Sequence, residues 1–290
     1  MPRFIIIVPL TPKKLLNPIR LKLFNIFFEN LKRIDYENWE AILIGEEEKL
    51  DGKIRFKKIG AESKEIKLIY AREYLKSITP KPDYVLRLDD DDLINPYIFE
   101  IIKNSKFDCY ADKHHLFYDL LSGRTSFQPR PWLANTVVHK YECAMEEIGE
   151  DGMTLLQCDH SKVWIDYYRE RRIIYANLRH PVYMRVLSPV SITSLLFQSE
   201  IQNGLNELNL DLTNDELMKF KKYLKGFGVW KNRNIANFEF GFKELMPLIM
   251  YRQPDDKVGF IQRLLFLIKK VSMLLLSLKR KWTKPVWKSS

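Results

Sequence analysis

The sequence predicts an α/β fold in which a mostly parallel sheet carries helices on both faces. In residues 1–105, short apolar runs that end at glycine, proline or acidic residues alternate with segments whose apolar residues recur at helical spacing. This alternation is typical of parallel sheets, whose ligands gather at the carboxyl ends of the strands. The chain has 290 residues and is 46% hydrophobic, which is ample for a large core.

The expected elements follow in chain order. We expect strands at 4–8, 39–44, 54–59 and 84–88 and helices at 19–34 and 64–77, with a turn at 79–82. Asn95 is expected to cap a further helix that has Pro96 in its first turn. Later in the chain we expect a strand at 107–111, a hairpin around 115–124, a helix at 159–169, a strand at 173–176 and a helix from 195 to about 223.

Four consecutive aspartates at 89–92 follow directly on the predicted strand at 84–88. Adjacent like charges repel, so such a run requires a cation or a set of hydrogen-bond donors. Strand alternation would place Asp89 and Asp91 on one side, and Asp90 and Asp92 on the other. Carboxylates suit Mg²⁺ or Mn²⁺, which leave coordination positions for water and substrate phosphates. The run therefore predicts a metal-phosphate site, and the alternative is an acidic loop that caps the next helix.

The net charge of +10 is concentrated at the C-terminus. Residues 251–290 hold ten basic and two acidic residues, so the rest of the chain is nearly neutral. Basic residues interrupt a wide apolar face in this tail, and two tryptophans follow, Trp282 and Trp287. This pattern predicts that residues 259–288 bind to an anionic membrane surface. It does not favour a helix that spans the membrane or a segment that binds nucleic acid. The alternative is a helix docked on the rest of the protein or on a second subunit.

Cysteine usage predicts a reducing compartment. Cys109, Cys143 and Cys158 are scattered and odd in number, which supports neither a disulfide framework nor a zinc ribbon. The apolar run at 4–8 is too short for a secretory signal, so we expect a cytoplasmic protein, peripheral on the inner face of the membrane.

Two sequence blocks carry a family resemblance. The first is LDDDD followed by LINP, and the second is DHSKVWIDYYRERRIIYANLRHPVYMRVLSPVSIT at 159–193. Together they resemble family 2 glycosyltransferases of the GT-A fold, whose signatures are L-D-x-D-D and E-D-x-x-L-W-x-R. The first block is also similar to a group of rhamnosyltransferases with a prominent arginine-leucine-aspartate run.

The resemblance implies a division of the chain. It implies a GT-A mixed sheet with helices on both faces over 1–195, in which 1–105 is the nucleotide-sugar-binding half and 106–195 the acceptor half. A helical extension at 196–250 and a basic amphipathic tail at 251–290 would follow.

For the metal, the resemblance implies that Asp89 and Asp91 form the D-x-D motif that holds Mn²⁺ or Mg²⁺. Asp91 would be the direct ligand and Asp89 would lie nearer the ribose or a metal-bound water, with Asp90 beside the nucleotide-sugar. Some members add a histidine to the metal, which would be His180 here; the alternative is a structural histidine.

For the nucleotide, the resemblance implies that Pro9 and Thr11 line the base and ribose and that Arg185 holds the diphosphate. Glu46 would recognise the base, unless 45–48 is simply a solvated loop. Arg72 would lie near the nucleotide, unless it forms a surface ion pair.

The family's base is the aspartate of its E-D pair, which takes the proton of the acceptor hydroxyl. The pair falls on Asp159 and His160, so a histidine stands at the base position. Asp159 is the preferred candidate and His160 the second, because a neutral imidazole is also a competent base. Glu150 and Asp151, a few residues earlier, form a literal E-D pair and are a further alternative.

The resemblance thus implies an inverting, metal-dependent glycosyltransferase. Its donor would be a nucleotide-sugar of the UDP, GDP or dTDP type, and its acceptor a glycan or lipid-linked sugar. The alternatives are a nucleotidyltransferase on a related fold and a degenerate, non-catalytic scaffold at the membrane.

Overall fold

A computed structural model describes residues 1–16, 18–60, 62–120, 122–148, 152–188, 214–230 and 240. Contacts divide the chain into two compact units, Met1–Met250 and Tyr251–Ser290, and every described residue belongs to the first. The predicted tail, most of the predicted helical extension, and Glu150 and Asp151 lie outside the described residues.

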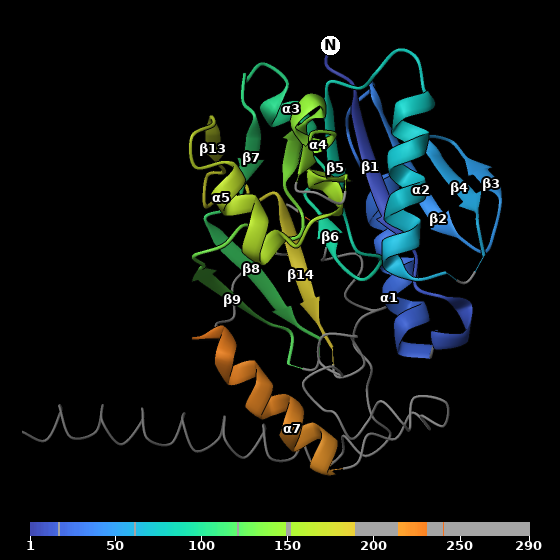
Figure 1. The fold of residues 1–290 in the computed structure, drawn as a ribbon. Helices are drawn as coiled ribbons and strands as arrows, with labels where there is room; N and C mark the ends of the chain where they lie inside the picture. Colours follow the sequence, from blue (N-terminus) through green and yellow to red (C-terminus); the bar gives the residue numbers. More distant parts are fainter. Residues whose placement is uncertain are drawn as a thin grey trace, which may run out of the picture. The chain divides into compact units, whose positions relative to one another are not determined.

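Within the described ranges, the main sheet has eight strands (Figure 1). In spatial order they are β13 (Ile173–Tyr175), β7 (Cys109–Ala111), β10 (Val138–Lys140), β5 (Tyr84–Arg87), β1 (Phe4–Pro9), β2 (Trp39–Gly45), β4 (Ile54–Lys58) and β3 (Lys49–Asp51). β5, β1, β2 and β4 pair in parallel, as do β13 and β7. β10 and β3 run antiparallel to their neighbours, so the sheet is mixed.

Helices cover both faces of this sheet, as the sequence predicts. The residues of β1 alternate between two cores: Phe4 joins the cluster that contains Leu23 of α1 (Pro18–Lys32), and Ile5 joins the cluster that contains Leu68 of α2 (Lys64–Ser77). Figure 1 shows α2 running alongside β1 and β2. α2 has the predicted bounds, and Ser63 caps it by accepting a hydrogen bond from the amide of Ile66 at 3.4 Å.

A smaller sheet of four strands continues from the main one. Its order is β6 (Leu93–Ile94), β14 (Tyr183–Leu187), β8 (His114–Asp119) and β9 (Arg124–Pro129). β8 and β9 form the hairpin predicted around 115–124. α7 (Asn214–Leu224) packs Phe220 and Leu224 against Phe117 and Leu187 of this sheet. Because β5 belongs to the main sheet and β6 to the smaller one, the four aspartates form the link between the two sheets.

The remaining elements are short. They are α3 (Ile98–Ile102), α4 (Tyr141–Ala144), α5 (Ile165–Tyr167), the hairpin of β11 (Glu147–Ile148) and β12 (Met153–Thr154), the 3₁₀ turns η1 (Lys13–Leu15), η2 (Leu155–Gln157) and η4 (Lys225–Phe227), and the π-helix η3 (His160–Trp164). Among the described residues, no helix has the length and apolar character needed to cross a membrane.

Two local expectations were wrong. Asn95 does not cap the next helix: α3 begins at Ile98, and the side chain of Asn95 instead accepts from the amide of Tyr97 at 3.0 Å and donates to the carbonyl of Pro181 at 3.0 Å. The single helix expected at 159–169 is a π-helix followed by the three residues of α5.

Candidate active site

The four aspartates form a turn and not an extension of the strand. β5 ends at Arg87, and the amide of Asp92 donates to the carbonyl of Asp89 at 3.2 Å. The expectation that Asp89 and Asp91 face one side while Asp90 and Asp92 face the other was therefore wrong. All four residues line one cavity at the carboxyl ends of β1 and β5.

Asp90 and Asp91 share one arginine. Arg20, in the first turn of α1, contacts Asp90 at 3.0 Å and Asp91 at 2.9 Å. Asp90 also accepts from the amide of Thr11 at 2.6 Å and from its hydroxyl at 3.0 Å. These contacts bind the loop after β1 to the aspartate turn.

Asp89 and Asp92 have different surroundings. Asp89 pairs with Lys64 of α2 at 2.6 Å. Burial alone would raise the pKa of Asp89, but the charges of Lys64 and of nearby arginines outweigh it and hold the pKa well below its usual range. Asp92 is buried and accepts from the amide of Val186 at 3.0 Å. Burial and repulsion by Asp91 raise the pKa of Asp92 well above its usual range.

We name the space in front of the aspartates the acidic cavity. Its volume is about 480 Å³, within the range of small-molecule sites. Pro9, Thr11 and Arg185, which the sequence analysis assigned to the nucleotide, all line it. Its charged lining consists of six acidic residues (Glu62, Glu65, Asp89, Asp90, Asp91, Asp92) and four basic residues (Arg20, Lys64, Lys67, Arg185).

Three of these basic residues were missed in the sequence. Arg20 and Lys64 lie in the first turns of helices, and Lys67 lies one turn further along α2. Lys67 is buried and donates to the carbonyl of Leu10 at 2.8 Å, and burial lowers its pKa. Helices that follow parallel strands begin at the carboxyl edge of the sheet. A search for basic residues in the first turns of 19–34 and 64–77 would have found Arg20 and Lys64.

A second cavity adjoins the first through Arg185, which lines both. Its volume is about 380 Å³, and we name it the aromatic cavity. Its lining comes from the smaller sheet, the segment after β9, the π-helix and the end of α7: His115, Phe117, Arg130, Trp132, Ala134, His160, Tyr183, Arg185, Tyr223, Gly226 and Phe227.

His160 is the base candidate that the structure brings to this cavity. Its Nδ1 lies 2.9 Å from the carbonyl oxygen of Leu133. A carbonyl oxygen only accepts hydrogen bonds, so Nδ1 carries the hydrogen and Nε2 keeps the lone pair of the neutral ring. Burial lowers the pKa of His160, which keeps the ring neutral at neutral pH.

Asp159, the preferred candidate from the sequence, has a different position. It is exposed and lines neither cavity. Its Oδ1 accepts from the amide and the hydroxyl of Ser161, both at 2.7 Å, and so caps the π-helix. Of the two candidates, the structure brings only His160 to a cavity.

Three further predicted residues lie outside both cavities. Glu46 accepts from the amide of Lys13 at 2.5 Å and so holds the loop after β1. Arg72 pairs with Glu73 at 2.7 Å, which is the alternative that the sequence left open. His180, which was expected to join the aspartates at the metal, is exposed in the segment before β14 and does not line the acidic cavity.

The donor set can be tested against the expected metal. Among the described residues, no group of three or more His, Cys, Asp or Glu side chains could hold a metal ion. Asp89 and Asp91 nevertheless both line the acidic cavity. The contact with Lys64 uses Oδ1 of Asp89, and the contact with Arg20 uses Oδ2 of Asp91. Two carboxylates fit a hard divalent cation that takes its other ligands from phosphate and water.

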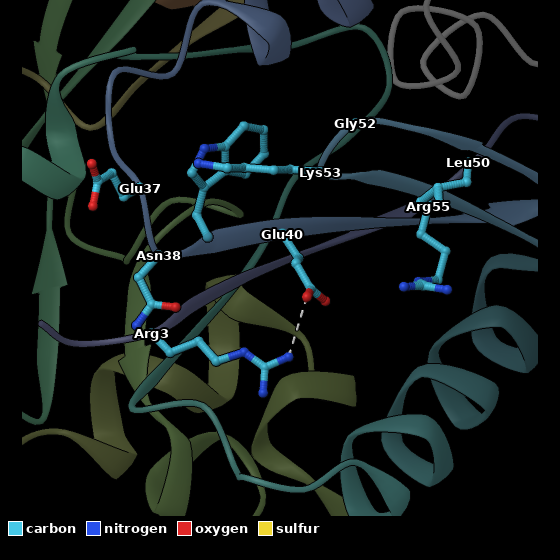
Figure 2. Close-up of a pocket in the computed structure, with 9 residues that line it drawn as sticks. Arg3, Glu37, Asn38, Glu40, Leu50, Gly52, Lys53 and Arg55 are labelled. Atoms are coloured by element: carbon cyan, nitrogen blue, oxygen red, sulfur yellow. Dashed lines mark ion pairs between the residues drawn. The ribbon is translucent and has the colours of Figure 1, made fainter.

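A third cavity lies at the amino ends of the strands, opposite the aspartates (Figure 2). It has a volume of about 220 Å³ and is lined mainly by polar residues near the amino ends of β1 and β2 and by the β3–β4 hairpin. Arg3 and Glu40 form an ion pair of 3.4 Å across it. Ligands of open α/β sheets bind at the carboxyl ends of the strands, so this third cavity is not the candidate site.

No family model and no curated protein matches this chain. Similar solved structures include residues 1–349 of TarS from S. aureus, with a TM-score of 0.42 and 13% identity over 90% of this chain and 78% of that chain. The galactosyltransferase LgtC, in complex with donor and acceptor sugar analogues, has a TM-score of 0.32 and 11% identity over 74% and 99%. The glycosyltransferase GlyE of Streptococcus pneumoniae TIGR4 has a TM-score of 0.36 and 6% identity over 78% and 64%. Named glycosyltransferases are thus among the structures that this chain resembles.

Proposed function

We propose that this protein is a glycosyltransferase that moves a sugar from a nucleotide-diphosphate donor to an acceptor hydroxyl. The observation that carries the proposal is the shared wall between the two cavities. Arg185 borders the acidic cavity, which holds the aspartate turn, and also the aromatic cavity, which holds His160. A transferase requires such a pair of neighbouring sites, one for the donor and one for the acceptor.

The acidic cavity is the proposed donor site. Pro9 and Thr11 border the space for the base and ribose of a UDP, GDP or dTDP sugar, and Arg185 faces the diphosphate. Acidic residues outnumber basic ones in the lining, so a diphosphate requires an added cation there. Asp89 and Asp91 would hold Mn²⁺ or Mg²⁺, which neutralises the charge of the leaving diphosphate.

His160 is the proposed base. Its Nε2 would take the proton of the acceptor hydroxyl while the acceptor oxygen bonds to the anomeric carbon and the bond from that carbon to the diphosphate oxygen breaks. Attack from the side opposite the leaving group inverts the anomeric configuration.

A thermal-shift screen tests the donor site. A panel of nucleotide-sugars with Mn²⁺ should stabilise the protein, by about 2.7 kcal/mol at a ligand concentration 100-fold above Kd. Asp91→Asn should abolish the stabilisation, whereas Asp166→Asn, at an exposed residue paired with Arg169 outside both cavities, should keep it.

Four outcomes would contradict the proposal. Equal stabilisation of the two variants would contradict the assignment of the donor site. So would the absence of stabilisation in the wild type and in both variants. Release of pyrophosphate from a nucleoside triphosphate would identify a nucleotidyltransferase instead. Donor binding without turnover on any acceptor would identify a non-catalytic scaffold.

The basic tail suggests where the acceptor is found. We propose that residues 259–288 bind an anionic membrane surface, so that the enzyme works on a lipid-linked sugar or a growing glycan at the inner face. In flotation with anionic liposomes, the full-length protein should rise with the vesicles, and a version ending at Gln253 should stay in the dense fraction. Equal flotation of both would contradict membrane binding by the tail.

A further inference from the structure

Arg130 occupies an unusual position in the aromatic cavity. Its guanidinium carbon lies 5.4 Å from the ring centroids of Phe117, Trp132 and Phe227. One terminal nitrogen donates to the carbonyl of Gly226 at 3.2 Å, while Nε is buried without a hydrogen-bond partner. Aromatic faces attract a cation, but they do not satisfy its hydrogen-bond donors.

The charge of Arg130 is not balanced within the described residues. None of the described residues that line the aromatic cavity is acidic, and none of the described carboxylates lies within ion-pair distance of Arg130. Burial and the like charge of Arg185 lower the pKa of Arg130. Leaving a cation partly buried and unpaired is costly, so this arrangement is suited to a ligand that brings the missing negative charge.

The two histidines of the aromatic cavity are neutral and do not offset the charge of Arg130. His115 is buried, its Nε2 has no hydrogen-bond partner, and burial lowers its pKa to about 3, so the ring is neutral. His160 is also neutral. Neither histidine supplies a negative charge, so among the described residues of the lining nothing offsets the charge of Arg130.

We propose that the aromatic cavity binds an acceptor sugar that carries a negative charge, as a phosphate or a carboxylate. The anionic group pairs with the guanidinium of Arg130, whose planar donors match two oxygens of such a group. The sugar ring lies against Trp132, which belongs to the same lining. This inference rests on the proposed function and specifies the chemistry of its acceptor.

The experiment is calorimetric titration of the full-length protein with three probes. Galactose 6-phosphate and galacturonic acid carry the two forms of the charge, and galactose is the neutral match. We expect at least one charged sugar to bind about tenfold or more tightly than galactose, because its hydrogen bonds to arginine are charge-assisted. The stronger of the two charged probes identifies the group as phosphate or carboxylate.

Variants assign the effect to Arg130. Arg130→Gln should weaken binding of the charged sugar about tenfold and leave binding of galactose unchanged. Arg130→Lys should keep part of the preference, because it retains the charge and loses the planar fork. Arg124→Gln, at an exposed residue at the other end of β9, should change neither.

Equal affinity of the wild type for all three sugars, or no detectable binding of either charged sugar, would overturn the inference. So would an Arg130→Gln variant that keeps the preference. Thermal stabilisation by a nucleotide diphosphate with Mn²⁺ is measured on the same variants and should be unaffected by Arg130→Gln. If that stabilisation is missing in the wild type while charged sugars bind, the proposed function fails and the anionic-sugar site remains.

Discussion

Arg87, the last residue of β5, connects the aspartate turn with the segment that carries His160. It is buried, and its guanidinium donates twice to Oδ1 of Asn135, at 2.9 and 2.6 Å, and to the carbonyl of Leu156 at 2.9 Å. It also lies 4.8 Å from the ring of Trp164 in the π-helix. One side chain therefore holds three segments together directly behind the site.

Replacing Arg87 by Met should destabilise the protein by about 3 kcal/mol, because the acceptors on Asn135 and Leu156 would be buried without partners. The free energy of unfolding in urea measures this. Arg124→Met, at an exposed position, should change it by less than about 0.5 kcal/mol. A loss at position 87 as small as the loss at position 124 would mean that the contacts of Arg87 contribute little.

The choice of base can also be tested residue by residue. With a donor from the stabilisation screen, His160→Gln should lower kcat by about 10²- to 10⁴-fold, the usual contribution of a general base. Asp159→Asn should keep activity within a few-fold, since asparagine also caps a helix and residue 159 lines neither cavity. The pH profile of kcat should lose its acid limb only in the His160 variant. A larger loss in Asp159→Asn would return the role to the aspartate.

At the scale of elements, long patterned segments were predictable and short ones were not. α2 has its predicted bounds because a cap and a helical period agree over 14 residues. β10 has three residues and runs antiparallel between β5 and β7, which is a pairing of distant segments that no local pattern indicates. The sidedness of the aspartates failed for a related reason: the alternation was extended past Arg87, where the strand ends.

In the candidate site, too, some residues were predictable from the sequence and others were not. Pro9 ends β1, Thr11 follows it, and the aspartates follow β5, so the topology of the sheet alone brings them together. The position of Arg72 depends on how α2 is rotated. Ala71 faces the core, and the next residue along the helix turns toward Gly152, to whose carbonyl Arg72 donates at 3.2 Å.

β10 also makes stability depend on pH. Its His139 is fully buried, contacts the hydroxyl of Tyr168 through Nδ1 at 2.6 Å and packs against Trp164. Burial lowers the pKa of His139 to about 3. The unfolded chain therefore binds a proton between about pH 6.5 and 3 that the folded chain does not, so stability is complete above that range and falls as the pH decreases through it.

The expected loss is about 1.4 kcal/mol per pH unit for this histidine. Urea unfolding at pH 7 and pH 5 measures it, with His139→Gln as the comparison, because glutamine cannot titrate. The free energy of unfolding of the variant should change less with pH, because its unfolding takes up one proton fewer. An unchanged slope would assign the pH dependence to other groups.

At the scale of the whole molecule, α7 links the stability of the smaller sheet to the shape of the aromatic cavity. Phe220 is fully buried against the sheet, and Tyr223, Gly226 and Phe227, which line the cavity, follow it in the chain. Phe220→Ala should cost about 3–5 kcal/mol and should weaken sugar binding more than nucleotide binding. Met218→Ala, on the exposed face of the same helix, is the control and should change neither by more than about 0.5 kcal/mol. Equal losses at the two cavities would mean that α7 supports the whole fold and not one site.

The wall formed by Arg185 has a thermodynamic consequence. The charges of Asp92 and Asp89 act on Arg185 from the acidic side, and its side chain also borders the aromatic side. A ligand that rearranges these charges on one side changes the free energy of binding on the other, and by linkage the factor is the same in both directions. At the two proposed sites, donor and acceptor affinities would therefore be coupled through one guanidinium, and binding of an unreactive acceptor analogue would change the dissociation constant of the donor.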